Sequence, residues 1–172
     1  MSATTLQNFM SVLDPQKTFK WEVVIPNMPG VTDSRQFTYK ALSTTIPGSS
    51  INQIKVEAHG VALHFSGRRV WTGTWNVTLV EDRLNNTRDG IWSWLERVRS
   101  WKDNSGSYKS QYAVPAELNL LDDANLTMRT IKLVNIWPTQ LSEPSADQSD
   151  DVIKYDVTFS YDFTDESGPG AA

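Results

Sequence analysis

The sequence contains no cysteine, so neither a disulfide framework nor a thiolate metal site is available to it. It has only two histidines, and no apolar run approaches the roughly 20 residues that a membrane-spanning helix requires. Its 16 basic and 20 acidic side chains give a net charge of -4, which argues against binding nucleic acid by neutralising phosphates. Residues 1–14 also lack the pattern of a secretory signal.

The chain is rich in the side chains that build a folded core. Hydrophobic residues make up 39% of it, and seven of them are tryptophans, which offsets the entropy of ordering a backbone. A length of 172 residues suits one domain. We therefore expect a single folded domain over residues 1–172.

Alternation of apolar and polar residues, the period-two pattern of a half-buried strand, dominates the chain. It predicts strands over residues 19–25, 37–41, 71–80, 117–121, 126–137 and 153–163. The first two are expected to form one hairpin, and the strands on either side of Asp122-Asp123 another. Between them, residues 44–73 read as two extended pieces around turns, a long connection of the kind that usually serves function.

One helix is predicted after the strand over residues 71–80. Asn86 is a suitable N-cap with Asp89 in the first turn, and Asn104 and Gly106 stop the helix. An apolar stripe is formed by Ile91, Trp94, Leu95, Val98 and Trp101. Trp92 lies off the centre of this stripe, where it either covers the edge of the core or anchors an interface.

These elements predict a mainly β protein, an antiparallel β-sandwich or barrel with one flanking α-helix and a long extended loop. Residues 1–17 are expected to be an N-terminal arm or short helix, and residues 164–172 a flexible tail. Long regular edge strands would make a monomer prone to aggregation. Pairing such edges between subunits of a closed ring removes that hazard.

The sequence offers no convincing catalytic or metal site, so we expect neither an enzyme nor a cofactor. His59 and His64 are spaced unlike a zinc motif and read as solvated loop or interface residues. The adjacent carboxylates Glu81-Asp82, Asp122-Asp123 and Asp150-Asp151 read as strand ends that face water. Gly60, Gly67 and Gly73 read as turns and a bulge rather than as a phosphate loop.

Several segments, taken in order, resemble the tail tube protein of contractile-tailed bacteriophages. They are Phe19-Lys20-Trp21-Glu22-Val23, Phe37-Thr38-Tyr39-Lys40-Ala41, Ile46-Pro47-Gly48, Trp75 through Asp82, and Ile136-Trp137-Pro138-Thr139 with the strand through Phe163. None of these is diagnostic alone, and the resemblance depends on their order, spacing and the total length. The same fold occurs in tail-like bacteriocins, extracellular contractile injection systems and type VI secretion tubes.

The resemblance implies a structural subunit that forms hexameric rings, which stack into a hollow conduit for DNA delivery. It implies a virion protein, assembled in the host cytoplasm, with sheath protein, baseplate tube-initiator, tail terminator and tape-measure protein as partners. DNA would be present only in transit. Residues 44–73 resemble the loop that family members extend to neighbouring subunits and to the adjacent ring. Its candidate contact residues are Ile46, Pro47, Gly48, Ile51, Ile54, Val56, His59, Val61, Leu63, Phe65, Arg68 and Arg69.

Two further surfaces follow as hypotheses. A DNA conduit works best when its lining repels phosphate, so polar strand faces are candidates for the lumen. These residues are Thr74, Asn76, Thr78, Asp156, Thr158, Ser160 and Asp162. Arg97, Arg99 and Lys102 concentrate positive charge and are either a solvated face or a surface that docks the sheath. The alternatives to a phage tube are the tube of a bacteriocin or injection system, or a β-sandwich carbohydrate-binding module.

Overall fold

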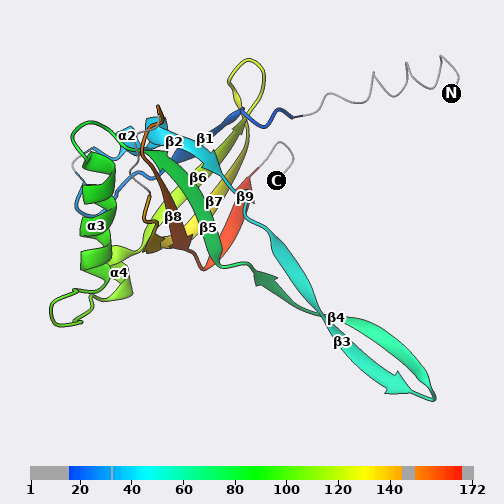
Figure 1. The fold of residues 1–172 in the computed structure, drawn as a ribbon. Helices are drawn as coiled ribbons and strands as arrows, with labels where there is room; N and C mark the ends of the chain where they lie inside the picture. Colours follow the sequence, from blue (N-terminus) through cyan, green and yellow to red (C-terminus); the bar gives the residue numbers. More distant parts are fainter. Residues whose placement is uncertain (1–15, 32, 145–149, 168–172) are drawn as a thin grey trace, which may run out of the picture.

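The computed structural model describes residues 16–31, 33–144 and 150–167, and it confirms the mainly β antiparallel fold (Figure 1). The strands are β1 (Trp21–Val24), β2 (Ala41–Thr44), β3 (Ser49–Ala58), β4 (Val61–Trp71), β5 (Thr74–Val80), β6 (Val114–Leu121), β7 (Thr127–Leu141), β8 (Lys154–Ser160) and β9 (Phe163–Ser167). The helices are α2 (Arg35–Lys40), α3 (Asn86–Val98) and α4 (Lys109–Tyr112). No described helix is long and apolar enough to span a lipid bilayer.

Seven of the strands form the body, and the long strand β7 joins its two parts. Up to Ile136, β7 pairs with β6 and β9; from Trp137 onward it pairs with β8. We call the part with β1, β6, β7 and β9 sheet A, and the part with β2, β5, β8 and the end of β7 sheet B. Asn135, one residue before the end of the first part of β7, has a positive φ of 58°. This bend lets one strand serve both sheets of the sandwich.

The core lies between the sheets and beneath α3, which runs along one flank of the body (Figure 1). Trp75, Val77 and Leu79 of β5 point inward, as their alternation predicts. Trp94 of α3 is fully buried, with its ring centroid 5.7 Å from that of Phe159 on β8. Aromatic packing thus fixes the helix against sheet B.

The predicted hairpin between residues 19–25 and 37–41 is wrong. Residues 35–40 form the short helix α2, and β1 pairs with β6 instead. Phe37 is the only buried residue of α2, whereas Tyr39, two positions on, is 84% exposed. An alternation of only five residues fits a helical turn with one buried side chain as well as it fits a strand.

The last predicted strand, over residues 153–163, is interrupted. Strand β8 ends at Ser160, and β9 begins at Phe163 beside the earlier part of β7. Tyr161 is buried between them, and the N–H of Asp162 donates to Val134 O. Residues 164–167, expected in the flexible tail, therefore belong to a strand. Residues 168–172, like residues 1–15 of the expected N-terminal arm, lie outside the described part of the chain.

Candidate assembly surfaces

The segment expected as a long loop is a two-stranded antiparallel arm that projects from the body (Figure 1). We define the arm as residues 46–73, with strands β3 and β4 joined by the turn at His59-Gly60. The arm continues the pairing of β2 with β5, so both of its ends are anchored in sheet B. The prediction of two extended pieces in this segment is confirmed.

One face of the arm is apolar and exposed to solvent. Directly opposite residues of an antiparallel pair share a face, and Ile54 lies opposite Phe65, with Val56 opposite Leu63. Phe65 is 53% exposed and Val61, near the tip, 60% exposed. The other face carries Lys55 opposite His64. A monomer gains nothing from such a surface, which is typical of an interaction site.

A bulge separates the outer arm from its root. The register shifts between Ile51 and Gln53, opposite Gly67. A Cβ atom placed on Gly67 would lie 2.8 Å from the backbone oxygen of Asn52, so only glycine fits there without a shift. Arg68 and Arg69 follow, both exposed, and neither has an ion pair within the described residues.

Sheet B presents a polar outer face that contains six of the seven predicted lumen residues. Thr74, Asn76 and Thr78 of β5 lie opposite Ser160, Thr158 and Asp156 of β8. The hydroxyl of Thr78 donates to Asp156 Oδ1 at 2.6 Å, and the hydroxyl of Thr158 donates to Asn76 Oδ1 at 2.9 Å. Two of the three pairs thus bond across the strands. Lys154, at the start of β8 on the same face, pairs with Asp151 at 3.0 Å.

Asp162, the seventh predicted lumen residue, lies beyond the end of β8. Its carboxylate accepts hydrogen bonds from Lys109 Nζ at 2.6 Å and from Asn135 Nδ2 at 2.8 Å. The Lys109 ammonium and the Asn135 amide lower the pKa of Asp162 below its ordinary value. This carboxylate therefore joins α4 to the bend of β7, a role that the alternation pattern did not indicate.

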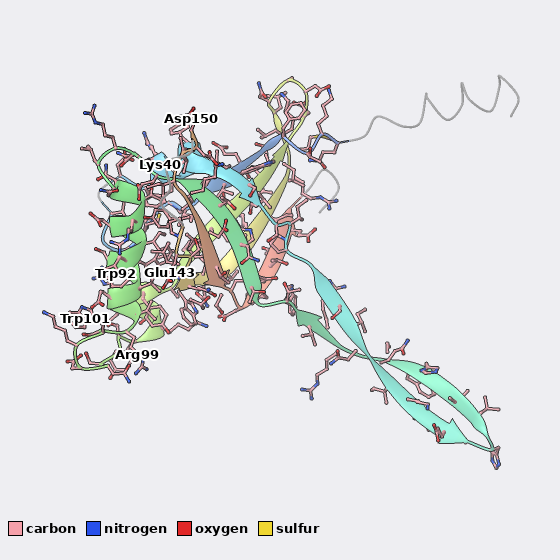
Figure 2. All side chains as sticks on the ribbon, viewed as in Figure 1. Lys40, Trp92, Arg99, Trp101, Glu143 and Asp150 are labelled. Atoms are coloured by element: carbon pink, nitrogen blue, oxygen red, sulfur yellow. The ribbon has the colours of Figure 1, made fainter. Side chains whose placement is uncertain are left out.

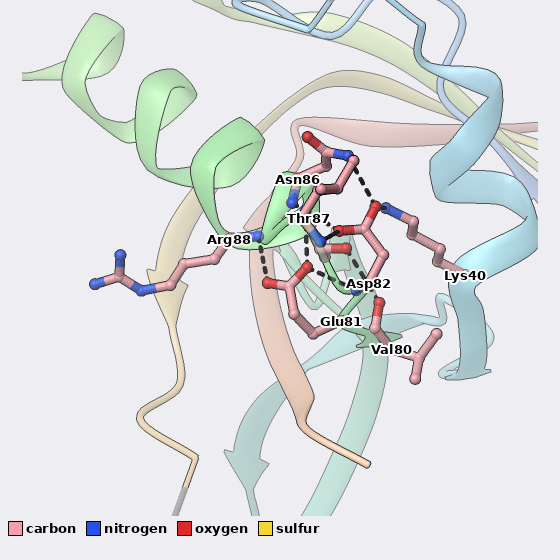
Figure 3. Close-up of polar contacts among 8 residues, drawn as sticks. Lys40, Val80, Glu81, Asp82, Asn86, Thr87 and Arg88 are labelled. Carbon is pink, nitrogen blue, oxygen red and sulfur yellow. Dashed lines mark hydrogen bonds and ion pairs between the residues drawn. The ribbon is translucent and has the colours of Figure 1, made fainter. Parts of the chain in front are cut away.

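The expectation that Glu81-Asp82 merely faces water is wrong, because both carboxylates cap α3 (Figure 3). Glu81 accepts from the N–H groups of Thr87 and Arg88, each at 3.0 Å. Asp82 Oδ1 accepts from the N–H of Asn86, and its Oδ2 accepts from Lys40 Nζ at 2.7 Å. Free N–H groups at a helix start need such partners. Asn86 is the first helical residue rather than the predicted cap, and Asn85 at the cap has left-handed backbone.

The predicted cations Arg97, Arg99 and Lys102 lie at or just past the C-terminal end of α3. Figure 2 shows Arg99 and Trp101 there, and Trp92 on the helix itself. The helix ends at Val98, so Trp101 leaves the predicted apolar stripe and is 71% exposed. Arg99 donates to Asn104 O at 2.8 Å, and Lys102 lies over the Trp101 ring. A groove of about 560 Å³ runs beside the helix, lined by Trp92, Trp101, Trp137 and neighbouring residues.

Within the described residues there is no group of three or more histidine or acidic side chains able to hold a metal ion. His59 sits at the turn of the arm and His64 on β4, both exposed, as expected for loop or interface histidines. The Asp122-Asp123 pair forms the turn between β6 and β7, as predicted. The candidate functional surfaces are therefore the apolar face of the arm, the polar face of sheet B and the groove beside α3.

Comparison with known proteins identifies the family of this chain. The family model for phage tail tube proteins matches residues 15–163, and the chain belongs to that family. It is a structural tube subunit of a phage tail or a contractile injection system, and the family is non-enzymatic. No curated protein matches the sequence significantly.

Solved structures share the fold at low sequence identity. A chain of the sheath/tube terminator of an extracellular contractile injection system is 17% identical, with TM-score 0.67, over 91% of this chain and 99% of that one. A chain of the anti-feeding prophage cap is 16% identical, with TM-score 0.66, over 91% and 93%. A chain of the injection system's sheath-tube complex is 16% identical, with TM-score 0.61, over 98% and 99%.

Proposed function

We propose that this chain is the repeating subunit of a contractile tail tube, in which six copies close into a ring and rings stack into a conduit. The observation that carries the proposal is the bare amphipathic arm, anchored at both ends in an open sheet. Within the described residues, neither the outer edge of β2 nor that of the β7 segment Trp137–Leu141 has a strand partner. Unpaired edges at both ends of one sheet suit head-to-tail closure of a ring.

The polar outer face of sheet B is the proposed lining of the conduit. If β2 of one copy pairs with the end of β7 in the next, sheet B continues around the ring and its outer face forms one wall. Most groups on this face are hydroxyls and amides, and Asp156 repels phosphate. Lys154, at the edge of the face, is paired with Asp151. Such a lining lets a polyanion pass without being held.

The proposed partners are the sheath, the terminator and the baseplate. Structures similar in fold come from assemblies described as a sheath-tube complex, a sheath/tube terminator and a baseplate. The exposed cations Arg97, Arg99 and Lys102 at the end of α3 remain the candidate contacts for the sheath. A virion location, a tape-measure protein in the lumen and a tube-initiator at the baseplate belong to the same proposal.

A tube of an extracellular injection system is the second candidate. It is favoured by the origin of the similar structures, several of which belong to extracellular injection systems or the anti-feeding prophage. The two candidates share the subunit architecture and differ in the cargo. Particles purified from the producing cell would separate them, since a phage tube is attached to a DNA-filled capsid.

Negative-stain electron microscopy of the purified protein tests the proposed function. We expect rings with six-fold averages, and hollow tubes at high protein concentration. A protein that stays monomeric in sedimentation experiments at high concentration would overturn the proposal. A variant with Val56→Asp and Leu63→Asp on the arm is the matched control, because it should keep the fold and lose the tubes.

A further inference from the structure

The sandwich is open along one seam, between the edge strands β1 and β2. Within the described residues, β1 pairs only with β6, and β2 only with β5. A groove of about 600 Å³ lies on this seam, lined from β1 by Trp21 and Glu22 and from β2 by Ala41 and Leu42. The two sheets are thus joined through β7 but not through these strands.

Large apolar side chains are exposed around this groove, which we call the seam groove. Phe19 and Tyr39 line it and are 70% and 84% exposed, and Leu42 is 48% exposed. Packed sandwiches normally cover their edge strands or protect them with charge. The seam groove therefore presents both unpaired strand edges and an apolar surface, the two features that an extended ribbon binds.

The arm has the complementary shape and chemistry. It is extended, its apolar face carries Ile54, Val56, Leu63 and Phe65, and no described residue outside the arm covers that face. Figure 1 shows the arm leaving one end of the body, while α2 and the start of β2 lie toward the other end. A contact between opposite ends of two copies is heterologous, and repeating it gives an open stack.

Charge also favours a second copy as the occupant. The arm contains three basic side chains, Lys55, Arg68 and Arg69, and one acidic side chain, Glu57, which gives +2. Because the whole chain carries -4, the remainder carries -6. Glu22 lines the seam groove and has no ion pair in the described part of the chain. The basic arm of one copy is thus attracted to the acidic body of another copy.

We propose that the seam groove, through Phe19, Tyr39 and Leu42, receives the apolar face of the arm of a second copy in the adjacent ring. This inference rests on the proposed function and names the surface that accepts the arm. Side-chain contacts at the groove leave the backbone of Ser43 and Thr44 free to pair laterally within the ring. One subunit then uses different surfaces for ring closure and for stacking.

Cysteine crosslinking tests the contact directly, because the chain has no native cysteine. Leu63→Cys marks the arm and Leu42→Cys marks the groove. We expect assembled double variants to give a ladder of multimers with a short bismaleimide, visible on denaturing gels. Mixed single variants should give dimers only, because each subunit then carries one cysteine and can be crosslinked only once. Each single variant alone should stay monomeric on the gel.

A matched pair tests the competing apolar groove beside α3, by combining Leu63→Cys with Trp101→Cys. Crosslinking of this pair in place of the Leu42 pair would overturn the inference. Rings and tubes that form normally without a Leu63–Leu42 crosslink would overturn it too, while leaving the proposed function intact. Absence of any assembly would reject both, because the seam groove would then have no occupant.

A substitution gives an independent readout. Leu42→Asp places a charge on an exposed position, so the fold should be retained while stacking is lost. Burying an unpaired carboxylate costs more than the 1.4 kcal/mol that equals a tenfold change, so we expect at least a tenfold loss of tubes relative to rings. Leu42→Met should keep the tubes. Tubes of normal length from Leu42→Asp would contradict the seam groove as acceptor.

Discussion

Lys40 Nζ lies 2.7 Å from Asp82 Oδ2 and joins the end of α2 to the start of α3. The Lys40 side chain is only 13% exposed, so the ammonium is held beside the carboxylate rather than in bulk water. Asp82 also accepts from the backbone N–H groups of Leu84 and Asn86. Lys40 is the main cause, and the N–H donors a further one, of a pKa for Asp82 far below its ordinary value.

The first prediction concerns Asp82→Asn and its dependence on pH. Since the folded state lowers the pKa of Asp82, ionised Asp82 stabilises the fold above the ordinary carboxyl value of 3.8. This contribution is lost as the pH falls below that value and the carboxylate takes up a proton. Urea midpoints of the wild type and Asp82→Asn should therefore differ most near neutral pH and converge in acid. Asp150→Asn, at an exposed position, is the control, and a difference independent of pH would contradict the prediction.

The second prediction separates two tryptophans of α3. Trp94 is fully buried and its Nε1 donates to Tyr112 O at 2.7 Å, whereas Trp92 is 46% exposed. Trp94→Phe leaves a half-buried carbonyl without its donor and removes part of a fully buried ring, which should cost about 1–3 kcal/mol of unfolding free energy. Trp92→Phe should change it by less than about 0.5 kcal/mol. Urea denaturation measures both, and equal losses would show that Trp92 also belongs to the core.

Much of the sheet was predictable because its alternation is long. Over Trp75, Val77 and Leu79 the pattern runs through a whole strand, and the structure buries all three. The hairpin of β6 and β7 was predicted from a turn between two such runs and is confirmed. Residues 37–41 were too short for the pattern to distinguish a strand from the helix α2.

The assembly surfaces were only partly predictable. Alternation grouped Thr74 with Asn76 and Asp156 with Thr158, because strand faces follow from period two alone. The ion pair of Asp82 with Lys40 joins residues 42 positions apart, and the seam groove brings Phe19 to Tyr39. Such neighbours depend on how the sheets close, which no local pattern contains. The acidic pair Glu81-Asp82, separated by three residues from the start of α3, was the one signal that could have indicated the cap.

The third prediction concerns the bulge of the arm. Gly67→Val forces the Asn52 backbone to move, because the added Cβ would lie 2.8 Å from its carbonyl oxygen. The arm contacts the core at its root through Trp71, not at Gly67. The thermal unfolding of the body should therefore be unchanged while tube formation falls sharply. Gly48→Ala is the matched control, since a Cβ there meets nothing within 4 Å. Normal tubes from Gly67→Val would show that the shape of the arm root does not matter for assembly.

The last prediction separates two carboxylates that the sequence placed together. Asp156 is exposed on the polar face of sheet B, whereas Asp162 holds Lys109 and Asn135. Asp156→Lys should therefore leave stability within about 0.5 kcal/mol and still form tubes. Asp162→Lys removes an ion pair and places two ammonium groups side by side, so we expect a loss of about 1 kcal/mol.

The same pair of variants tests the lining of the conduit. If the face of sheet B lines the lumen, tubes of Asp156→Lys carry a ring of lysines inside and should retain short duplex DNA at low salt. That retention should fall steeply as salt is added, because it depends on phosphate neutralisation. Fluorescent DNA and pelleted tubes provide the measurement, with wild-type tubes as the reference. If tubes of Asp156→Lys bind no more DNA than wild-type tubes, a different face of the subunit lines the lumen.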